Sequence, residues 1–172
     1  MLSQWRNGTF CFEVNGMKKA HIILTEPDEQ NPAATISLTY DERLLRRKKL
    51  VTDQGEAFVL DLEQTANLKC GDVIQWTDGT LVLIKAKEET LAKVIGDNLL
   101  ELAWHIGNRH TPCQICGDHL LIQHDSIIEH MITHLGGKVT LVSEPFNPMG
   151  GAYGFGRTQP HEHGATTHAH SH

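Results

Sequence analysis

Between residues 35 and 86 the chain consists of short segments in which polar and apolar residues alternate, separated by turn sequences. Alternation with a period of two is typical of a strand that has one buried face and one solvated face. Asp78-Gly79 favours the positive backbone angles of a tight hairpin turn. The predicted strands are residues 35–40, 50–52, 57–62, 73–76 and 81–84. We therefore expect a small, mostly β domain over residues 1–86.

The start of this domain gives weaker signals. Residues 10–14 are compatible with a short strand, whereas residues 26–32 are polar, contain two prolines and indicate a loop. Met17 offers a second possible start, so the order of residues 1–16 stays open.

Beyond residue 86 the spacing of apolar residues changes to that of helices. Residues 88–106 place leucine and isoleucine at helical intervals, with an interruption near Gly96, and predict a first helix. A second helix is expected to begin at Asp125 or Ser126, whose short polar side chains favour the N-cap position. The side chains predicted to be buried on this helix are Ile127, Ile128, Met131 and Leu135.

Strands complete the second domain. They are predicted at residues 114–122, around a Gly-Asp turn, and at residues 138–142. Helix, strands, helix and strand together fit a ferredoxin-like α/β sandwich. We expect this domain over residues 87–153, which makes the whole chain an α+β protein.

The composition changes again after Gly150, where glycine, threonine and histidine dominate. Such a segment cannot offset its ordering entropy by burial, so we expect residues 154–172 to form a disordered, histidine-rich tail. Five of the twelve histidines lie there: His161, His163, His168, His170 and His172. Imidazole nitrogen suits nickel, zinc and copper, and alternate spacing lets several rings converge on one ion. A purification tag is the alternative, but tags are unbroken runs and this segment includes Glu162.

Several classes of protein are disfavoured. The formal net charge of −6 argues against a nucleic-acid partner. No apolar run approaches the roughly 18 residues that span a bilayer, and the N-terminus lacks a signal-peptide pattern. We therefore expect a cytoplasmic protein without membrane contact, whose four cysteines are not a disulfide framework. No nucleophile–base or nucleotide-binding motif indicates an enzyme.

The segment from Leu102 to Pro112, which reads LAWHIGNRHTP, resembles the signature of UreE-type urease accessory proteins. Further stretches agree with that family in order and spacing, namely residues 38–43, 46–50, 70–73, 145–146 and 151–158. The resemblance implies a nickel metallochaperone with a β domain, a ferredoxin-like domain and a homodimer formed through the latter. It places the family's near-essential metal ligand at His110, paired across the dimer axis. The implied partners are the GTPase of urease assembly and, through it, the apo-urease complex.

Departures from the family pattern leave some roles open. Many relatives have an Asp-His pair at the start of the second helix, where this chain has Asp125-Ser126. His130 and His134 share one helix face, either as a substitute chelate or as two solvated side chains. His110, Cys113, Cys116 and His119 recur every three residues, as in a zinc site. On a strand, however, Cys113 and Cys116 face opposite sides, which favours structural thiols.

Five cations lie within seven residues: Arg43, Arg46, Arg47, Lys48 and Lys49. They form either a solvated strand and turn or a docking patch for an acidic partner. The sequence thus predicts a protein that binds Ni²⁺, with Zn²⁺ or Cu²⁺ competing, and delivers it to apo-urease. One rival is a histidine-rich protein that stores nickel or zinc. Another is a peptide-binding β domain in which metal only regulates dimerisation.

Overall fold

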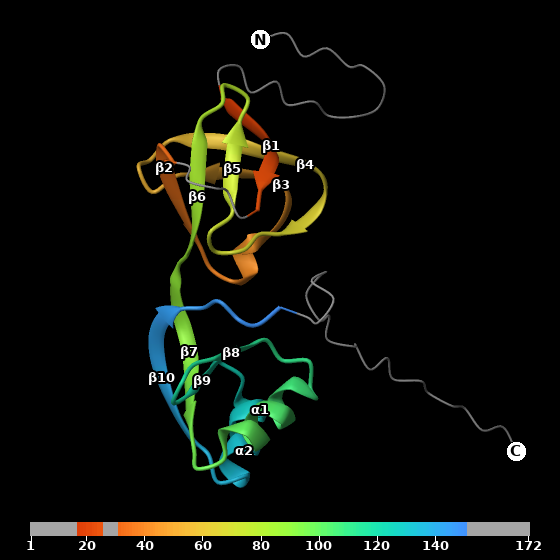
Figure 1. Ribbon diagram of the computed structural model, residues 1–172, viewed down its shortest axis with the longest axis vertical. Helices are drawn as coiled ribbons and strands as arrows, with labels where there is room; N and C mark the ends of the chain where they lie inside the picture. The colour runs from red at the N-terminus through yellow and green to blue at the C-terminus, as the bar shows by residue number, and fades with distance from the viewer. Residues whose placement is uncertain (1–16, 26–30, 151–172) are drawn as a thin grey trace, which may run out of the picture.

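The computed structural model describes residues 17–25 and 31–150, and it consists of two sheets arranged along the long axis of the molecule (Figure 1). β6 (Leu81–Ala86) leads through Lys87 into β7 (Glu88–Ile95), so one nearly continuous stretch of strand links the sheets. The expected strand at residues 10–14 and the tail histidines lie outside the described residues. Within the described ranges no helix is long and apolar enough to cross a bilayer.

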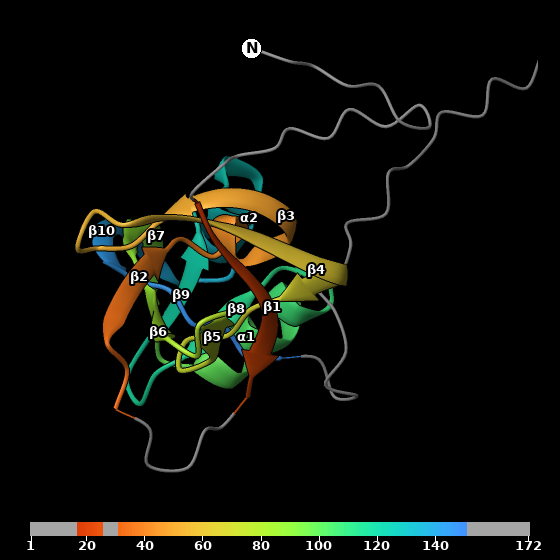
Figure 2. The same ribbon diagram turned by 90° about the horizontal axis from the view of Figure 1, so that it is seen from above.

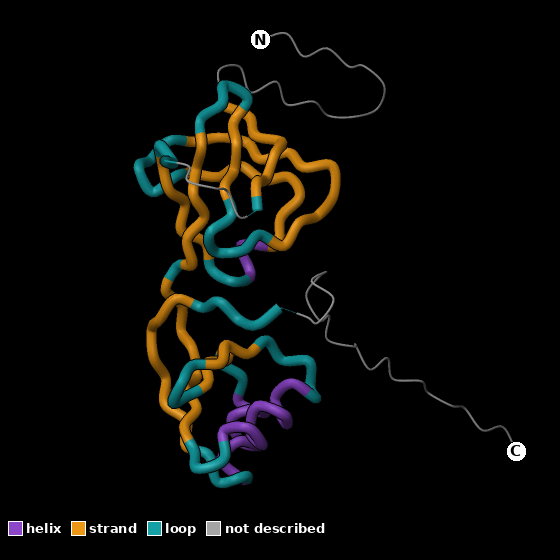
Figure 3. The backbone as a smooth tube through the Cα atoms, viewed as in Figure 1, coloured by secondary structure: helices purple, strands orange, loops and turns teal. Residues whose placement is uncertain are grey.

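The first sheet has six strands in the order β2-β6-β5-β1-β4-β3 and curls around its own core (Figure 2). The strands not yet given are β1 (Lys18–Leu24), β2 (Ala34–Leu38), β3 (Leu44–Val51), β4 (Ala57–Asn67) and β5 (Val73–Trp76). A short 3₁₀ helix, η1 (Asp41–Arg43), precedes β3. The mostly β character predicted for this part of the chain is confirmed, as the backbone trace shows (Figure 3).

The core of the first sheet follows from the alternation in its strands. Ile36, Phe58 and Leu60 point inward and are almost fully buried, together with Trp76 from β5. The turn between β3 and β4 is tied back to β2, because Asp53 accepts hydrogen bonds from the Thr35 hydroxyl and from the Ser37 backbone and side chain. β2 and β3 are the first and last strands of the sheet. These hydrogen bonds therefore connect its two edges and stabilise its curled shape.

The second sheet has four strands in the order β10-β7-β9-β8, with neighbouring strands antiparallel. Its remaining elements are α1 (Leu99–Gly107), β8 (Cys113–Ile115), β9 (Leu120–Gln123), α2 (Ser126–His134) and β10 (Lys138–Pro145). The resulting β-α-β-β-α-β order is the ferredoxin-like arrangement that the sequence predicted. Both helices pack on one face of the sheet, over a core that includes Val94, Ile106 and Ile132.

The predicted helix over residues 88–106 is wrong in its first half, which forms strand β7. β7 is a central strand with both faces covered. Leu91 packs in a cluster with Phe146 on one face, whereas Ala92 and Val94 face the helices. A strand buried on both sides carries apolar residues in succession, so its pattern resembles a buried helix. The helix itself begins only after Asn98, whose side chain accepts a hydrogen bond from the Glu101 backbone nitrogen.

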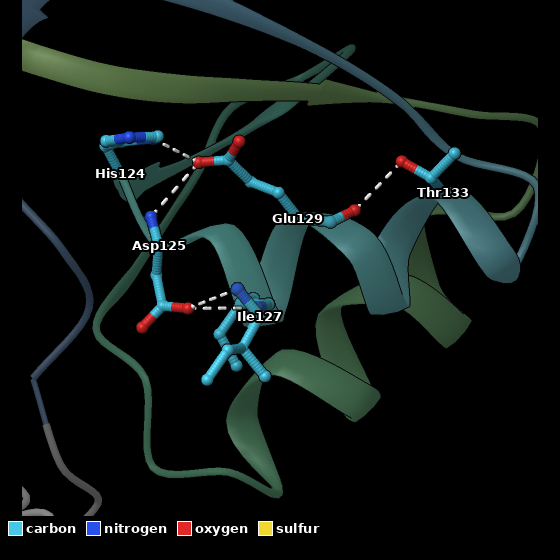
Figure 4. Close-up of polar contacts among 6 residues, drawn as sticks. His124, Asp125, Ile127, Glu129 and Thr133 are labelled. Carbon is cyan, nitrogen blue, oxygen red and sulfur yellow. Dashed lines mark hydrogen bonds and ion pairs between the residues drawn. The ribbon is translucent and has the colours of Figure 1, made fainter.

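The second helix begins where the sequence predicted, but its buried face is rotated. The Asp125 carboxylate caps α2 by accepting hydrogen bonds from the backbone nitrogens of Ile127 and Ile128 (Figure 4). Ile128 and Ile132 are buried, while Ile127 is 78% exposed. The expected burial of Ile127 and Leu135 is therefore wrong, because the true apolar stripe runs through Ile128 and Ile132.

Candidate metal site

His110 occupies a sharp turn immediately after α1. Its φ of 57° makes it the one residue other than glycine with a positive φ among those the structure describes. The backbone nitrogen of His110 donates to Gly107 and that of Arg109 to Ile106, so a tight turn ends the helix. Histidine enters this left-handed region more readily than bulky residues do, but the conformation still carries strain. The turn leaves His110 exposed at the surface.

A pocket of about 460 Å³ opens beside His110, between the two sheets. The first domain contributes the stretch from Asn67 to Cys70, and α1 and β8 contribute the opposite wall. The third wall is the segment from Asn147 to Gly150, which leads toward the histidine-rich residues. His110 therefore shares a pocket with Gly150, which precedes the histidine-rich segment in the sequence.

Hydrogen bonds hold that third wall in place. The Asn147 backbone nitrogen donates to Gln114 Oε1 at 2.6 Å, and the Met149 nitrogen donates to the Cys113 carbonyl at 2.9 Å. From the first domain, Arg43 donates to the Phe146 carbonyl and, at 3.5 Å, to Asn147 Oδ1. Contacts from both domains thus hold the segment from Phe146 to Met149 next to His110.

The cysteines near His110 lie on different faces of the second sheet. Cys113 packs against the core beneath the helices, whereas Cys116 packs against the cluster around Phe146. Burial raises the pKa of the Cys113 thiol to about 11, with a smaller contribution from Cys116. A thiol with that pKa stays protonated near pH 7, whereas the thiolate is the form that binds metal. Cys70 is exposed and lines the same pocket as His110.

The other described histidines are dispersed. His124 Nδ1 lies 2.6 Å from Glu129 Oε1, and the same oxygen accepts from the Asp125 nitrogen at the start of α2 (Figure 4). His119 Nδ1 lies 2.6 Å from Asp118 on the β8–β9 turn. His130 and His134 are exposed on α2. The four-residue spacing of these two histidines places them on one helix face, where they offer at most two ligands.

Across residues 17–25 and 31–150, no three histidine, cysteine or carboxylate side chains are grouped closely enough to hold a metal ion. The tail histidines named above belong to residues 151–172 and lie outside the described residues. A single imidazole is a weak, unselective ligand, because binding strength and selectivity come from several donors in a fixed geometry. His110 therefore needs donors from elsewhere to form a firm site.

Sequence reasoning missed a pair of exposed apolar side chains on α1. Leu100 is 85% exposed and Trp104 63% exposed. They lie four residues apart, so they share a face of the helix that ends at the His110 turn. The signal was present in the sequence: both residues fall off the stripe formed by Leu102 and Ile106, which are buried. A large exposed tryptophan beside another apolar residue is typical of an interaction surface.

Comparison with known proteins covers both domains. Two sequence-family models match the chain. Residues 18–87 match the family described as UreE urease accessory protein, N-terminal domain, and residues 89–172 match the family described as UreE urease accessory protein, C-terminal domain. A protein named urease accessory protein UreE from Ruegeria pomeroyi is 52% identical over 128 residues, which are 74% of this chain and 86% of that protein. Proteins of the same name from Cereibacter sphaeroides and Rhodobacter capsulatus are 46% and 45% identical over 86% of this chain, covering 81% and 94% of their own lengths. Together with the two-domain fold, these matches show that the chain belongs to the UreE family of urease accessory proteins.

Proposed function

We propose that this protein is a nickel metallochaperone that binds Ni²⁺ through His110 and delivers it to apo-urease while the urease active site matures. The observation that carries the proposal is the geometry of His110. Its exposed imidazole stands on a strained turn beside a pocket, in a chain that belongs to a urease accessory family. Strained backbone at an exposed side chain is a common mark of functional positions.

A second copy of the chain supplies a second His110. The exposed side chains of Leu100 and Trp104 lie on the helix that leads into the His110 turn, and two such faces would bury each other in a symmetric dimer. The two His110 turns then lie near the same axis. Each copy also has Gly150 on the wall of the His110 pocket.

The tail provides the remaining donors. Ten residues separate Gly150 from His161, so the two lie eleven residue steps apart, and a chain of that length spans at most about 36–40 Å. The tail is therefore long enough to bring its histidines to His110 of the same copy or of its partner. The proposed ligands are His110 and the tail residues His161, His163, His168, His170 and His172.

Such a site suits delivery. Two fixed imidazoles bind the ion modestly, and tail imidazoles tighten the binding without closing the coordination shell. A receiving protein can then replace the tail ligands one at a time, whereas a closed structural site would retain the metal. Nickel is the cargo, and Zn²⁺ or Cu²⁺ compete because imidazole binds all three ions. The role is non-catalytic and cytoplasmic, and the receiving partners are the urease-assembly GTPase and the apo-urease complex.

Calorimetric nickel titration tests the site. His110→Asn removes the imidazole but keeps a residue that tolerates positive φ, which alanine does less well. We expect a form ending at Gln159 to retain one nickel per two chains, and the same form with His110→Asn to lose it. His105→Asn is the matched control, since His105 lies on α1 itself, and should leave binding unchanged. Unchanged nickel binding in the shortened His110→Asn protein would exclude His110 as a ligand.

The dimer has its own test. Trp104→Glu places a charge in the exposed apolar face of α1 and should shift the protein toward monomers in analytical ultracentrifugation. His110→Asn should remain dimeric, because apolar contacts rather than metal hold the two copies. A dimer unaffected by Trp104→Glu would show that another surface forms the interface.

A further inference from the structure

The strands β1, β4 and β3 bring cations from two separate parts of the sequence onto one face of the first sheet. Lys19 pairs with Val59, and Val59 pairs with Lys49, so the three residues form one row across the strands. Along β4, Val59 alternates with Phe58 and Leu60, which are fully buried. The row therefore faces away from the core. Lys19 and Lys49 are exposed, and two strand spacings set their backbones about 9–10 Å apart.

A second row on the same face is centred on Asp61, two residues after Val59. Arg47 pairs with Asp61 and donates two hydrogen bonds of 2.7 Å to its carboxylate. His21 Nδ1 lies 2.8 Å from the Asp61 carbonyl oxygen. The hydrogen bond from Arg47, with the charges of Arg47, His21 and Arg46, lowers the pKa of Asp61. Arg47 thus binds the carboxylate directly, and the two rows together form one basic face.

Protection of a sheet edge is the simplest explanation of lysines on an outer strand. β3 is the last strand in the sheet order, and charged residues on such a strand discourage pairing with other chains. That explanation accounts for Lys48, which is exposed although it pairs with the buried Leu60. It does not account for Lys19, which lies on the internal strand β1, nor for its alignment with Lys49. Lys19 and Lys49 therefore leave positive charge on the outward face of the sheet as well as at its edge.

We propose that this basic face, formed by Lys19, Arg47 and Lys49, docks an acidic segment of the protein that receives the nickel. The identity of that receiver rests on the proposed function. Charge complementarity favours a protein segment, because the chain as a whole carries a net charge of −6 and would repel an extended polyanion such as nucleic acid.

The proposal is tested by measuring association of the full-length, nickel-loaded protein with the purified urease-assembly GTPase of the same organism, at low and high salt. Lys19→Glu with Lys49→Glu reverses the charge of one row, and neither lysine contributes to the core. We expect this double variant to associate at least about tenfold more slowly at low salt, since complementary charges act mainly on the association rate. The difference should shrink at high salt, where charges are screened. Lys87→Glu with Lys138→Glu makes the same charge change at exposed positions away from this face and should associate like the original protein.

Equal slowing in the two double variants would overturn the proposal, because net charge alone would then explain it. Normal association of the Lys19→Glu, Lys49→Glu protein, or no association of the original protein, would also overturn it. Stronger charge-dependent binding to vesicles of phosphatidylcholine and phosphatidylserine would assign the face to a membrane instead. Lys19→Gln with Lys49→Gln repeats the test without added repulsion should the reversed form fail to fold. Nickel titration of each variant is expected to be unchanged, so failure of the docking surface is distinguishable from failure of the nickel site.

Discussion

Arg43 is the residue through which the first domain holds the chain beside His110, and its replacement gives a quantitative prediction. The side chain is only 2% exposed and donates to the carbonyls of Phe146 and Thr39 and to Asn147 Oδ1. Arg43→Met keeps most of the apolar stem but removes every donor. The bonds to Thr39 and Asn147 are long, at 3.4 and 3.5 Å, so the bond to the Phe146 carbonyl is the strongest of the three.

A buried carbonyl without its partner costs about 1–3 kcal/mol, and a hydrogen bond from a charged donor is worth about 1.5–3 kcal/mol. We therefore expect Arg43→Met to lower the free energy of unfolding by about 2–3 kcal/mol in urea denaturation. Hydrogen exchange at the Met149 amide should quicken, because the segment it belongs to loses an anchor. Arg46→Met, at an exposed position of β3, should change stability by less than about 0.5 kcal/mol. If Arg43→Met lowers the free energy of unfolding no more than Arg46→Met does, the role given to Arg43 is refuted.

Three further predictions follow from local contacts. Gly137→Ala should destabilise by about 1–3 kcal/mol in the same denaturation assay, because its Cβ would lie 2.7 Å from Ile132 Cγ2. Iodoacetamide at pH 7.5 should modify Cys70 well before Cys113, whose pKa is raised to about 11, as peptide mass spectrometry would show. Partial burial opposes ionisation of Asp53, but its hydrogen bonds outweigh burial and lower its pKa. Asp53→Asn should therefore lower the free energy of unfolding at pH 7, where Asp53 is ionised. The difference between the two proteins should disappear as the pH falls below about 4, the ordinary carboxylate value. A difference that does not change with pH would contradict this.

The sequence predicted strands either from alternation or from a turn signal. β2 and β6 alternate between buried and less buried residues and were found in that way. β5 buries both Val73 and Ile74, and it was found because the Asp78-Gly79 turn marks a hairpin with β6. β7 is covered on both faces, so its apolar residues are consecutive and were assigned to a helix. β1 was missed because its register shifts between Ala20 and Ile22, which interrupts the alternation.

The resemblance to a known family singled out His110, but the surroundings of His110 could not be read from the sequence. The pocket joins residues near positions 43, 70 and 149, which only the arrangement of two domains brings together. The basic run at residues 43–49 was visible, yet it does not act as a unit. Arg43 turns inward to the domain boundary, and Lys19 joins the exposed members through strand pairing. These placements depend on tertiary contacts, which local sequence patterns do not predict.

Urease activity measured against added nickel, in cells that lack this protein, tests the central proposal most directly. The cells would carry the full-length protein, the form ending at Gln159 or His110→Asn. A carrier centred on His110 predicts that the shortened form supports activation when nickel is plentiful and fails progressively as nickel becomes scarce. His110→Asn should activate poorly at low nickel even with its tail intact. If removal of the tail abolishes activation at every nickel concentration while His110→Asn has no effect, the protein is a nickel store and the carrier account is wrong.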